Sequence, residues 1–327
     1  MTLRIAVIGA GIMGADHVST LHRFVSGAEV QVVADVDLSR AELAVASMDA
    51  WATDDPLAAI ADPEVDALVI ASHDSTHAEL VLAAVRAGKP VLCEKPLTAS
   101  PDESLRLRAA VGAQTGLVSL GFMRRFDPGY ARLKTAIDTR ALGRTLLVHC
   151  ISRGVSSGPG TTSESAVIGS AVHEFDVVPW LLGSPVVEAS WLAPASTSQA
   201  IGLQDPQLIL LRTADGVLTT CETFLNAGYG YDIRCEVVGE TGAISLTEPS
   251  RALIDRLGGR SVEYGADWRP RFADAYRLEL QAWVDSLRLG TASPLAGFED
   301  GIRADLVARA VIESMHNGGS FIRATDR

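Results

Sequence analysis

The sequence is poor in cysteine, and its cysteines lie far apart. Four occur in 327 residues, with no C-x-x-C pair: Cys93, Cys150, Cys221 and Cys235. The histidines and acidic residues also form no cluster with the spacing of metal ligands. The pattern argues against a disulfide framework and against a metal site, and it predicts reduced thiols.

Positive charge is also scarce. The chain has 28 Lys and Arg residues against 40 Asp and Glu, giving a formal net charge of −12, and the acidic residues are spread along its length. Nucleic acid is therefore not an expected partner, because phosphate backbones bind clustered Lys and Arg. A phosphate-bearing cofactor remains compatible, since a helix N-terminus binds phosphate through its backbone N–H groups.

Long apolar runs are absent. No stretch approaches the roughly 18 apolar residues that a membrane-spanning helix needs. The first apolar run, Leu3 to Gly9, is too short for a secretory signal. We therefore expect a cytoplasmic protein without a membrane partner. Aromatic residues make up only 6% of the chain, whereas Ala, Val and Leu dominate, a balance typical of Val-rich parallel strands covered by Ala-rich helices.

Residues 3–120 alternate between strand-like and helix-like segments. The expected strands are Leu3–Ile8, Val30–Ala34, Ala67–Ala71, Val91–Cys93 and Leu117–Leu120. The expected helices are Ile12–Val25, Ser39–Ser47, His77–Ala87 and Asp102–Ala113. Such alternation predicts an α/β domain with a doubly wound parallel sheet and right-handed crossovers.

The pattern changes after residue 121. The expected helices are Pro128–Ile137, Ser170–Leu182, Arg271–Leu289 and Gly301–Met315. The expected strands are Leu146–Ile151, Val186–Leu192, Gln207–Thr213, Val217–Phe224, Ile233–Val238 and Ala243–Leu246. Because these strands follow one another without helices, they predict an α+β domain with an open, largely antiparallel sheet. We expect domain limits of 1–121, 122–295 and 296–327, the last being a helix that packs back on the first domain.

The first chemical motif is a glycine string, Gly9-Ala10-Gly11-Ile12-Met13-Gly14, between a strand and a helix. In the Rossmann pattern, Gly9 permits a tight turn, Gly11 lets the backbone approach a pyrophosphate, and Gly14 lets the helix pack closely on the strand. The N–H groups of Ile12 and Met13 then point at the phosphates. The motif predicts a dinucleotide site.

Asp35 follows the second strand at the distance where an acid meets the adenosine ribose. A carboxylate there accepts hydrogen bonds from the ribose hydroxyls and repels a 2′-phosphate, so NAD is the expected cofactor. The alternative is that Asp35 and Asp37 only cap the helix that follows. Arg40 lies close enough to weaken the discrimination against NADP.

A second motif, Glu94-Lys95-Pro96, follows the strand Val91–Cys93. Together with the glycine string it resembles the Gfo/Idh/MocA oxidoreductase family. The stretch from Gly121 to Tyr130 is similar to the segment that opens the second domain in the inositol 2-dehydrogenases of that family. The resemblance implies that Lys95 lies between the nicotinamide ribose and the substrate and eases transfer of the hydroxyl proton. The alternative for Lys95 is a surface lysine in a loop.

The third motif, Val172-His173-Glu174-Phe175-Asp176, lies in a helix-like segment. By resemblance, His173 accepts the proton of the hydroxyl that is oxidised, and imidazole suits this task because its ordinary pKa is about 6.5. The alternative is a structural helix histidine. The family places an aspartate four residues earlier, where this chain has Gly169. Glu164, in the preceding loop, is a possible substitute.

The resemblance also assigns supporting residues. It places Ser72, His77 and Glu94 at the cofactor, with His77 alternatively a structural histidine of the turn. Arg125 and Tyr231 are expected at the substrate, against the alternatives of an ion pair and of core packing.

The expected activity is hydride transfer between NAD and a secondary alcohol of a cyclitol, polyol or sugar, by a homotetramer. Two alternatives stay open. One is an NAD-assisted lyase, epimerase or glycosidase without net redox change, and the other is a catalytically silent NAD-binding regulator.

Overall fold

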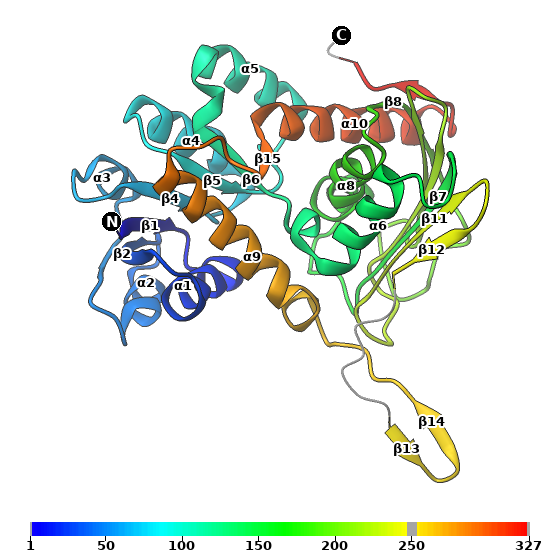
Figure 1. The fold of residues 1–327 in the computed structure, drawn as a ribbon, viewed down its shortest axis with the longest axis horizontal. Helices are drawn as coiled ribbons and strands as arrows, with labels where there is room; N and C mark the ends of the chain where they lie inside the picture. The colour runs from blue at the N-terminus through cyan, green and yellow to red at the C-terminus, as the bar shows by residue number, and fades with distance from the viewer. Residues whose placement is uncertain (1, 247–253, 326–327) are drawn as a thin grey trace. The chain divides into compact units, whose positions relative to one another are not determined.

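A computed structural model describes residues 2–246 and 254–325 and divides the chain into two compact units (Figure 1). The first comprises Met1–Phe126 and Asp274–Asp305, and the second Asp127–Ala273 and Leu306–Arg327. The chain passes from the second unit to the first within helix α9 (Trp268–Leu289) and returns within α10 (Phe298–His316). The domain limits expected from the sequence stay a prediction.

The first unit is built on a mainly parallel sheet. Its strands are β1 (Leu3–Ile8), β2 (Ala28–Ala34), β3 (Trp51–Thr53), β4 (Ala67–Ile70), β5 (Val91–Glu94), β6 (Val118–Gly121) and β15 (Ala296–Gly297). They lie in the order β15-β6-β5-β4-β1-β2-β3. All neighbouring pairs are parallel except β15 with β6. The order reverses between β1 and β4, which is where ligands bind in sheets of this kind.

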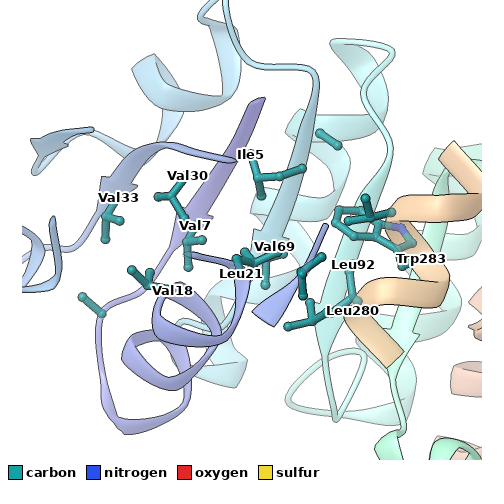
Figure 2. Close-up of a cluster of buried hydrophobic side chains, with 14 of the residues drawn as sticks. Ile5, Val7, Val18, Leu21, Val30, Val33, Val69, Leu92, Leu280 and Trp283 are labelled. Atoms are coloured by element: carbon teal, nitrogen blue, oxygen red, sulfur yellow. The ribbon is translucent and has the colours of Figure 1, made fainter. Parts of the chain in front are cut away.

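Helices connect these strands and cover them. They are α1 (Ile12–Phe24), α2 (Leu38–Val45), α3 (Pro56–Ala61), α4 (His77–Arg86) and α5 (Pro101–Val111), with short 3-10 turns at Asp74–Thr76, Gly112–Leu117 and Met123–Phe126. Figure 2 shows part of the core, in which Leu280 and Trp283 of α9 lie with Val69 and Leu92 of the sheet. Helix α9 therefore supplies part of the apolar cover of this sheet.

The strands and helices expected in this unit are confirmed, apart from small differences at their ends. Strands β3 and β15 and helix α3 were not predicted, because they are too short to show a hydrophobic period. Helix α3 nevertheless carries a start signal. Asp55 accepts a hydrogen bond from the N–H of Ala58, and Pro56 occupies the first turn.

The second unit contains a largely antiparallel sheet. Its strands are β7 (Thr145–Arg153), β8 (Val186–Leu192), β9 (Gln207–Thr213), β10 (Leu218–Phe224), β11 (Asp232–Gly239), β12 (Ala243–Ser245) and β16 (Ile322–Arg323), in the order β12-β11-β7-β10-β9-β8-β16. β7 and β10 are parallel, and the other neighbours are antiparallel. Strands β13 (Ile254–Arg256) and β14 (Gly259–Ser261) form a separate hairpin. The expected open sheet is confirmed.

Helices α6 (Pro128–Asp138) and α8 (Val172–Leu182) pack together on one face of this sheet (Figure 1). The helix expected over Ser170–Leu182 begins differently. A short α7 (Ser163–Ala166) runs into a π-helical turn, Val167–Ala171, before α8 begins. A π turn holds more residues than an α turn, so side-chain positions before Val172 do not follow α-helical spacing.

A buried carboxyl group lies in the first unit. Asp305 of α10 accepts a hydrogen bond from the hydroxyl of Ser104, which also contacts the hydroxyl of Thr98 at 2.7 Å. All three side chains are buried. Burial raises the pKa of Asp305 to about 7, although the bond from Ser104 opposes the shift. The folded protein thus favours the neutral acid.

This burial predicts a pH-dependent effect of Asp305→Asn on stability. Between about pH 4 and pH 7 folded Asp305 retains a proton that the unfolded chain has lost, so its contribution to the free energy of unfolding falls as pH rises through this window. Asparagine does not ionise, so the variant does not lose free energy of unfolding in this way. Urea unfolding should show its stability relative to the wild type increasing from pH 5 to pH 8 by up to about 3 kcal/mol. A difference that is the same at both pH values would contradict the burial argument.

Candidate active site

The glycine string forms a tight junction between β1 and α1. A Cβ atom on Gly14 would lie 1.8 Å from the carbonyl oxygen of Gly9, so only glycine allows α1 to pack this closely. Gly9 has a φ of +98°, and a Cβ there would lie 2.6 Å from the backbone nitrogen of Ser72. Gly9 thus has the positive φ of a tight turn, and Gly14 allows the close packing of helix on strand.

The N-terminus of α1 opens on a groove of about 750 Å³ within the first unit. Gly11 is the N-cap, and no side chain caps the helix. No atom lies within 4 Å of a Cβ built on Gly11, and Ile12 is 70% exposed. The groove is lined by Gly9, Gly11, Ile12, Met13, Asp35, Arg40, Asp54, Asp55, Pro56, Leu57, Ser72 and His73, among others. Bare backbone N–H groups at a helix start form a site for a phosphate, so this groove fits a dinucleotide.

Asp35 lines this groove and also organises the loops around it. One carboxylate oxygen accepts the N–H of Ala10 at 2.6 Å, and the other accepts the N–H of Asp37 at 2.9 Å. The helix cap belongs to Asp37, whose carboxylate accepts the N–H of Ser39. Asp35 is thus tied to the glycine string, and Asp37 does the capping.

The loop Asp54–Leu57 also lines the groove, and the sequence analysis missed it. Leu57 is 46% exposed, an apolar surface that suits a flat ring. The signal that would have found this loop is the Asp-Pro start of α3. Because β3 was not predicted, the sequence did not show that this loop follows the edge strand of the sheet.

Lys95 directly follows β5, at the carboxyl end of the parallel strands. It is partly buried. Burial lowers the pKa of the Lys95 amine, Glu94 opposes this shift, and the positive charge of Arg124 adds to it. A lowered pKa makes the amine a better carrier of protons near neutral pH.

Glu94 is buried and shared between two partners. One carboxylate oxygen lies 2.8 Å from Nε2 of His17, a buried histidine of α1 that the sequence analysis did not single out. The other oxygen accepts the backbone N–H of Lys95 at 3.2 Å. A Cβ on Gly121 would lie 2.9 Å from the carboxyl group, so the glycine leaves the space that Glu94 occupies.

His77 begins α4 and is buried. Its Nδ1 lies 2.8 Å from the carbonyl oxygen of Pro96, and its Nε2 lies 3.1 Å from that of Ser72. The side chain thus joins the loop after β4 to the peptide that follows Lys95. The structure thereby brings together Ser72, His77, Glu94 and Lys95 of the sequence prediction.

The second unit holds the histidine motif on α8. His173, Glu174 and Asp176 are all buried. In the same unit, Cys150 of β7 and Cys221 of β10 lie opposite each other on neighbouring strands. Burial raises the pKa of the Cys221 thiol well above its ordinary value, and the charge of Glu174 contributes to the shift.

The other predicted residues have identifiable contacts. Arg125 pairs with Asp300 at 3.3 Å, which is the ion pair that the sequence left open. The ring of Tyr231 packs edge-on against Phe272, with 6.3 Å between centroids.

Glu164 does not turn toward the histidine motif. Its carboxylate lies 2.7 Å from Nε2 of His316 on α10. No atom lies within 4 Å of a Cβ built on Gly169, apart from the neighbouring backbone. The structure therefore gives Glu164 a different partner from the one considered in the sequence analysis.

In residues 2–246 and 254–325, no group of three or more His, Cys, Asp or Glu side chains is arranged to hold a metal ion. Over the same residues, no helix is both long and apolar enough to cross a membrane.

The fold and the groove define a dinucleotide-binding protein of the Rossmann class, and the family models that match this chain describe NAD-binding oxidoreductases. Residues 3–122 match the model of the oxidoreductase family with an NAD-binding Rossmann fold, and residues 134–321 match that of its C-terminal alpha/beta domain. The chain belongs to the Gfo/Idh/MocA oxidoreductase family. The fold class and the NAD cofactor expected from the sequence are confirmed.

Individual relatives cover almost the whole chain. Inositol 2-dehydrogenase 2 of Paenarthrobacter aurescens is 56% identical over 331 residues, covering 99% of each chain. Inositol 2-dehydrogenase 1 of Saccharopolyspora erythraea is 46% identical, covering 97% of this chain and 95% of the relative. The crystal structure of myo-inositol dehydrogenase from Lactobacillus casei, in complex with NAD(H) and myo-inositol, matches with a TM-score of 0.94 at 28% identity, covering 100% of this chain and 98% of that one.

The place of Asp35 in the wall of the groove predicts its effect on cofactor choice. Asp35→Ser should raise the KM for NAD by about tenfold, because a charge-assisted contact contributes about 1.5–3 kcal/mol, and should improve the relative use of NADP. Asp37→Ser is the matched control, since serine also caps a helix and should leave the preference unchanged. Steady-state kinetics with both cofactors measure this. Equal effects of the two variants would show that Asp35 acts only through its loop.

Proposed function

We propose that this protein is an NAD-dependent dehydrogenase that oxidises a secondary alcohol of a cyclitol, with myo-inositol as the first candidate substrate. The observation that carries the proposal is similarity over nearly the full length to inositol 2-dehydrogenases, at 56% identity in the Paenarthrobacter aurescens relative. The Lactobacillus casei structure, which contains NAD(H) and myo-inositol, supports the same substrate class. Other polyols and sugars are the alternative substrates within this reaction.

The proposed chemistry uses two side chains, Lys95 and His173. Bound NAD supplies the acceptor for the hydride. Lys95 orients the substrate hydroxyl and helps to move its proton, a role that suits an amine with a lowered pKa. His173 is the general base that accepts this proton. Arg125 and Tyr231 are proposed at the substrate, and Ser72, His77 and Glu94 at the cofactor.

We further propose that Gly169 stands where related enzymes carry a carboxylate beside the histidine. A carboxylate there would fix the imidazole tautomer and stabilise its protonated form. The uncrowded Cβ position of Gly169 supports the proposal, because it offers room for a side chain.

A homotetramer is the proposed assembly. Apolar side chains that alternate with buried ones lie partly exposed on the outer face of the second sheet: Leu147, Ile151, Leu208, Leu210, Leu218 and Phe224. They share this face with polar side chains such as Thr220 and Glu222, and we take this mixed surface as the proposed contact between copies. The cytoplasmic location expected from the sequence stays a prediction.

A dehydrogenase assay with a Lys95 variant tests the proposed function. Purified protein with NAD and myo-inositol should form NADH and an inosose in equal amounts. Lys95→Ala should lose at least 90% of kcat, because it removes the group that handles the proton, while its dissociation constant for NAD changes little. Product formation without NADH would favour the lyase, epimerase or glycosidase alternative. Tight NAD binding without turnover on a panel of polyols and glycosides would favour a regulator.

Restoring a carboxylate tests the proposal for Gly169. Gly169→Asp should raise kcat on myo-inositol about tenfold or more if the rest of the site is arranged as in related dehydrogenases. Gly169→Asn, which adds a side chain of the same size without charge, is the control and should give no such gain. If neither variant is faster than the wild type, the lack of a carboxylate at residue 169 does not limit this enzyme.

A further inference from the structure

The short segment Glu94–Pro96 is held by two buried histidines from other parts of the first unit. His17 comes from α1 and is 0% exposed, and His77 comes from the start of α4 and is 1% exposed. Neither histidine takes part in the proton transfer proposed above. Each instead bonds to a residue directly beside Lys95 in the chain.

On the N-terminal side, the contact runs through a side chain. Nε2 of His17 lies 2.8 Å from one oxygen of Glu94, and the other oxygen accepts the backbone N–H of Lys95. The carboxylate thus bridges α1 and the lysine backbone. Gly121, opposite Glu94 on the neighbouring strand β6, leaves the space that this bridge requires.

On the C-terminal side, the contact runs through a backbone carbonyl. Nδ1 of His77 lies 2.8 Å from the oxygen of Pro96, while Nε2 faces the oxygen of Ser72 at the longer distance of 3.1 Å. Ser72 lines the nucleotide groove. One imidazole ring therefore links the wall of the groove to the peptide that follows Lys95.

We propose that His17 and His77 are positioning residues that fix the backbone of Lys95 from both sides, so that its amine reaches the substrate hydroxyl. The proposal rests on the function proposed above for Lys95. A lysine side chain has a flexible stem with several rotatable bonds, so its reach is defined only if the backbone at its base is fixed. Misplacing a reacting group by about 1 Å costs up to about 100-fold in rate.

The two histidines use different ring nitrogens for this purpose. His17 uses Nε2, and its Nδ1 has no hydrogen-bond partner among the described residues. His77 uses Nδ1 for the contact with Pro96. The side-chain amide of glutamine places an N–H near the position of Nε2, whereas that of asparagine places one near Nδ1. The same two substitutions should therefore have opposite effects at the two positions.

Four variants test this: His17→Gln, His17→Asn, His77→Asn and His77→Gln. We expect kcat on myo-inositol to fall about 10- to 100-fold further in His17→Asn than in His17→Gln, and about 10- to 100-fold further in His77→Gln than in His77→Asn. NAD affinity should hold in His77→Gln, which keeps the contact with Ser72, and should weaken in His77→Asn, which loses it. Thermal unfolding of all four variants separates these effects from loss of the fold.

A packing role alone would give a different result. If Asn and Gln rank in the same order at both positions, or if kcat follows thermal stability across the four variants, the positioning role is wrong. Unchanged kcat in all four would also overturn it.

A second measurement needs no turnover. Labelling of the Lys95 amine by an amine-specific reagent, followed by mass spectrometry over a range of pH, reports its environment in cofactor-free protein. We expect wild-type profiles in His17→Gln and His77→Asn, and profiles shifted toward those of an exposed lysine in the other two. Identical profiles in all four would contradict the inference. If the wild type fails to oxidise any polyol but the profiles differ as expected, the proposed function fails while the positioning of Lys95 stands.

Discussion

The reversal of strand order between β1 and β4 is the constraint on which the rest of the first unit depends. Crossovers on its two sides run in opposite directions, so α1 and α4 leave the sheet edge apart from each other and open a groove. Gly9 and Asp35 follow β1 and β2, and Lys95 follows β5 on the far side of the reversal. Residues far apart in the sequence thus gather at one edge because they end parallel strands.

The first unit buries several polar groups, and the free-energy cost of burying each one depends on its hydrogen-bond partner. Burying an unpaired polar group costs about 1–3 kcal/mol, which a hydrogen bond largely offsets. His17 and Glu94 form such a pair, and His77 lies between two backbone carbonyls, to one of which the N–H of a neutral ring donates. Asp305 has a hydroxyl partner but no cation in its pKa balance, and its pKa rises accordingly. The contacts of the two histidines thus hold the segment Glu94–Pro96. The single hydroxyl contact of Asp305 does not offset its burial, so ionisation of this carboxyl group is disfavoured.

Much of this arrangement was predictable from the sequence, because it depends on local signals. Glycines at fixed spacing predicted the nucleotide groove, and runs of Val and Ile predicted the strands of both sheets. The loop Asp54–Leu57 was missed because its strand and helix are too short to show a period. The contact of His17 could not be predicted, because nothing in an amphipathic helix distinguishes this histidine from others. Its partner, Glu94, lies 77 residues away in the sequence and is brought beside it only by the fold. The π turn before α8 was missed because hydrophobic spacing does not separate it from an α turn.

That π turn bears on the proposed chemistry of the second unit. In an α-helix, residues four apart share a face, so an acid at residue 169 would stack directly on His173. Within Val167–Ala171 the wider π turn changes the angle between residues that are four apart. A side chain at residue 169 would begin in open space. In the mechanism proposed above, an enzyme without a carboxylate near His173 lacks one source of stabilisation for the protonated imidazole, and more of the proton's transfer falls to Lys95. The lysine's lowered pKa and the rigidity of its backbone then matter more than in an enzyme with the acid.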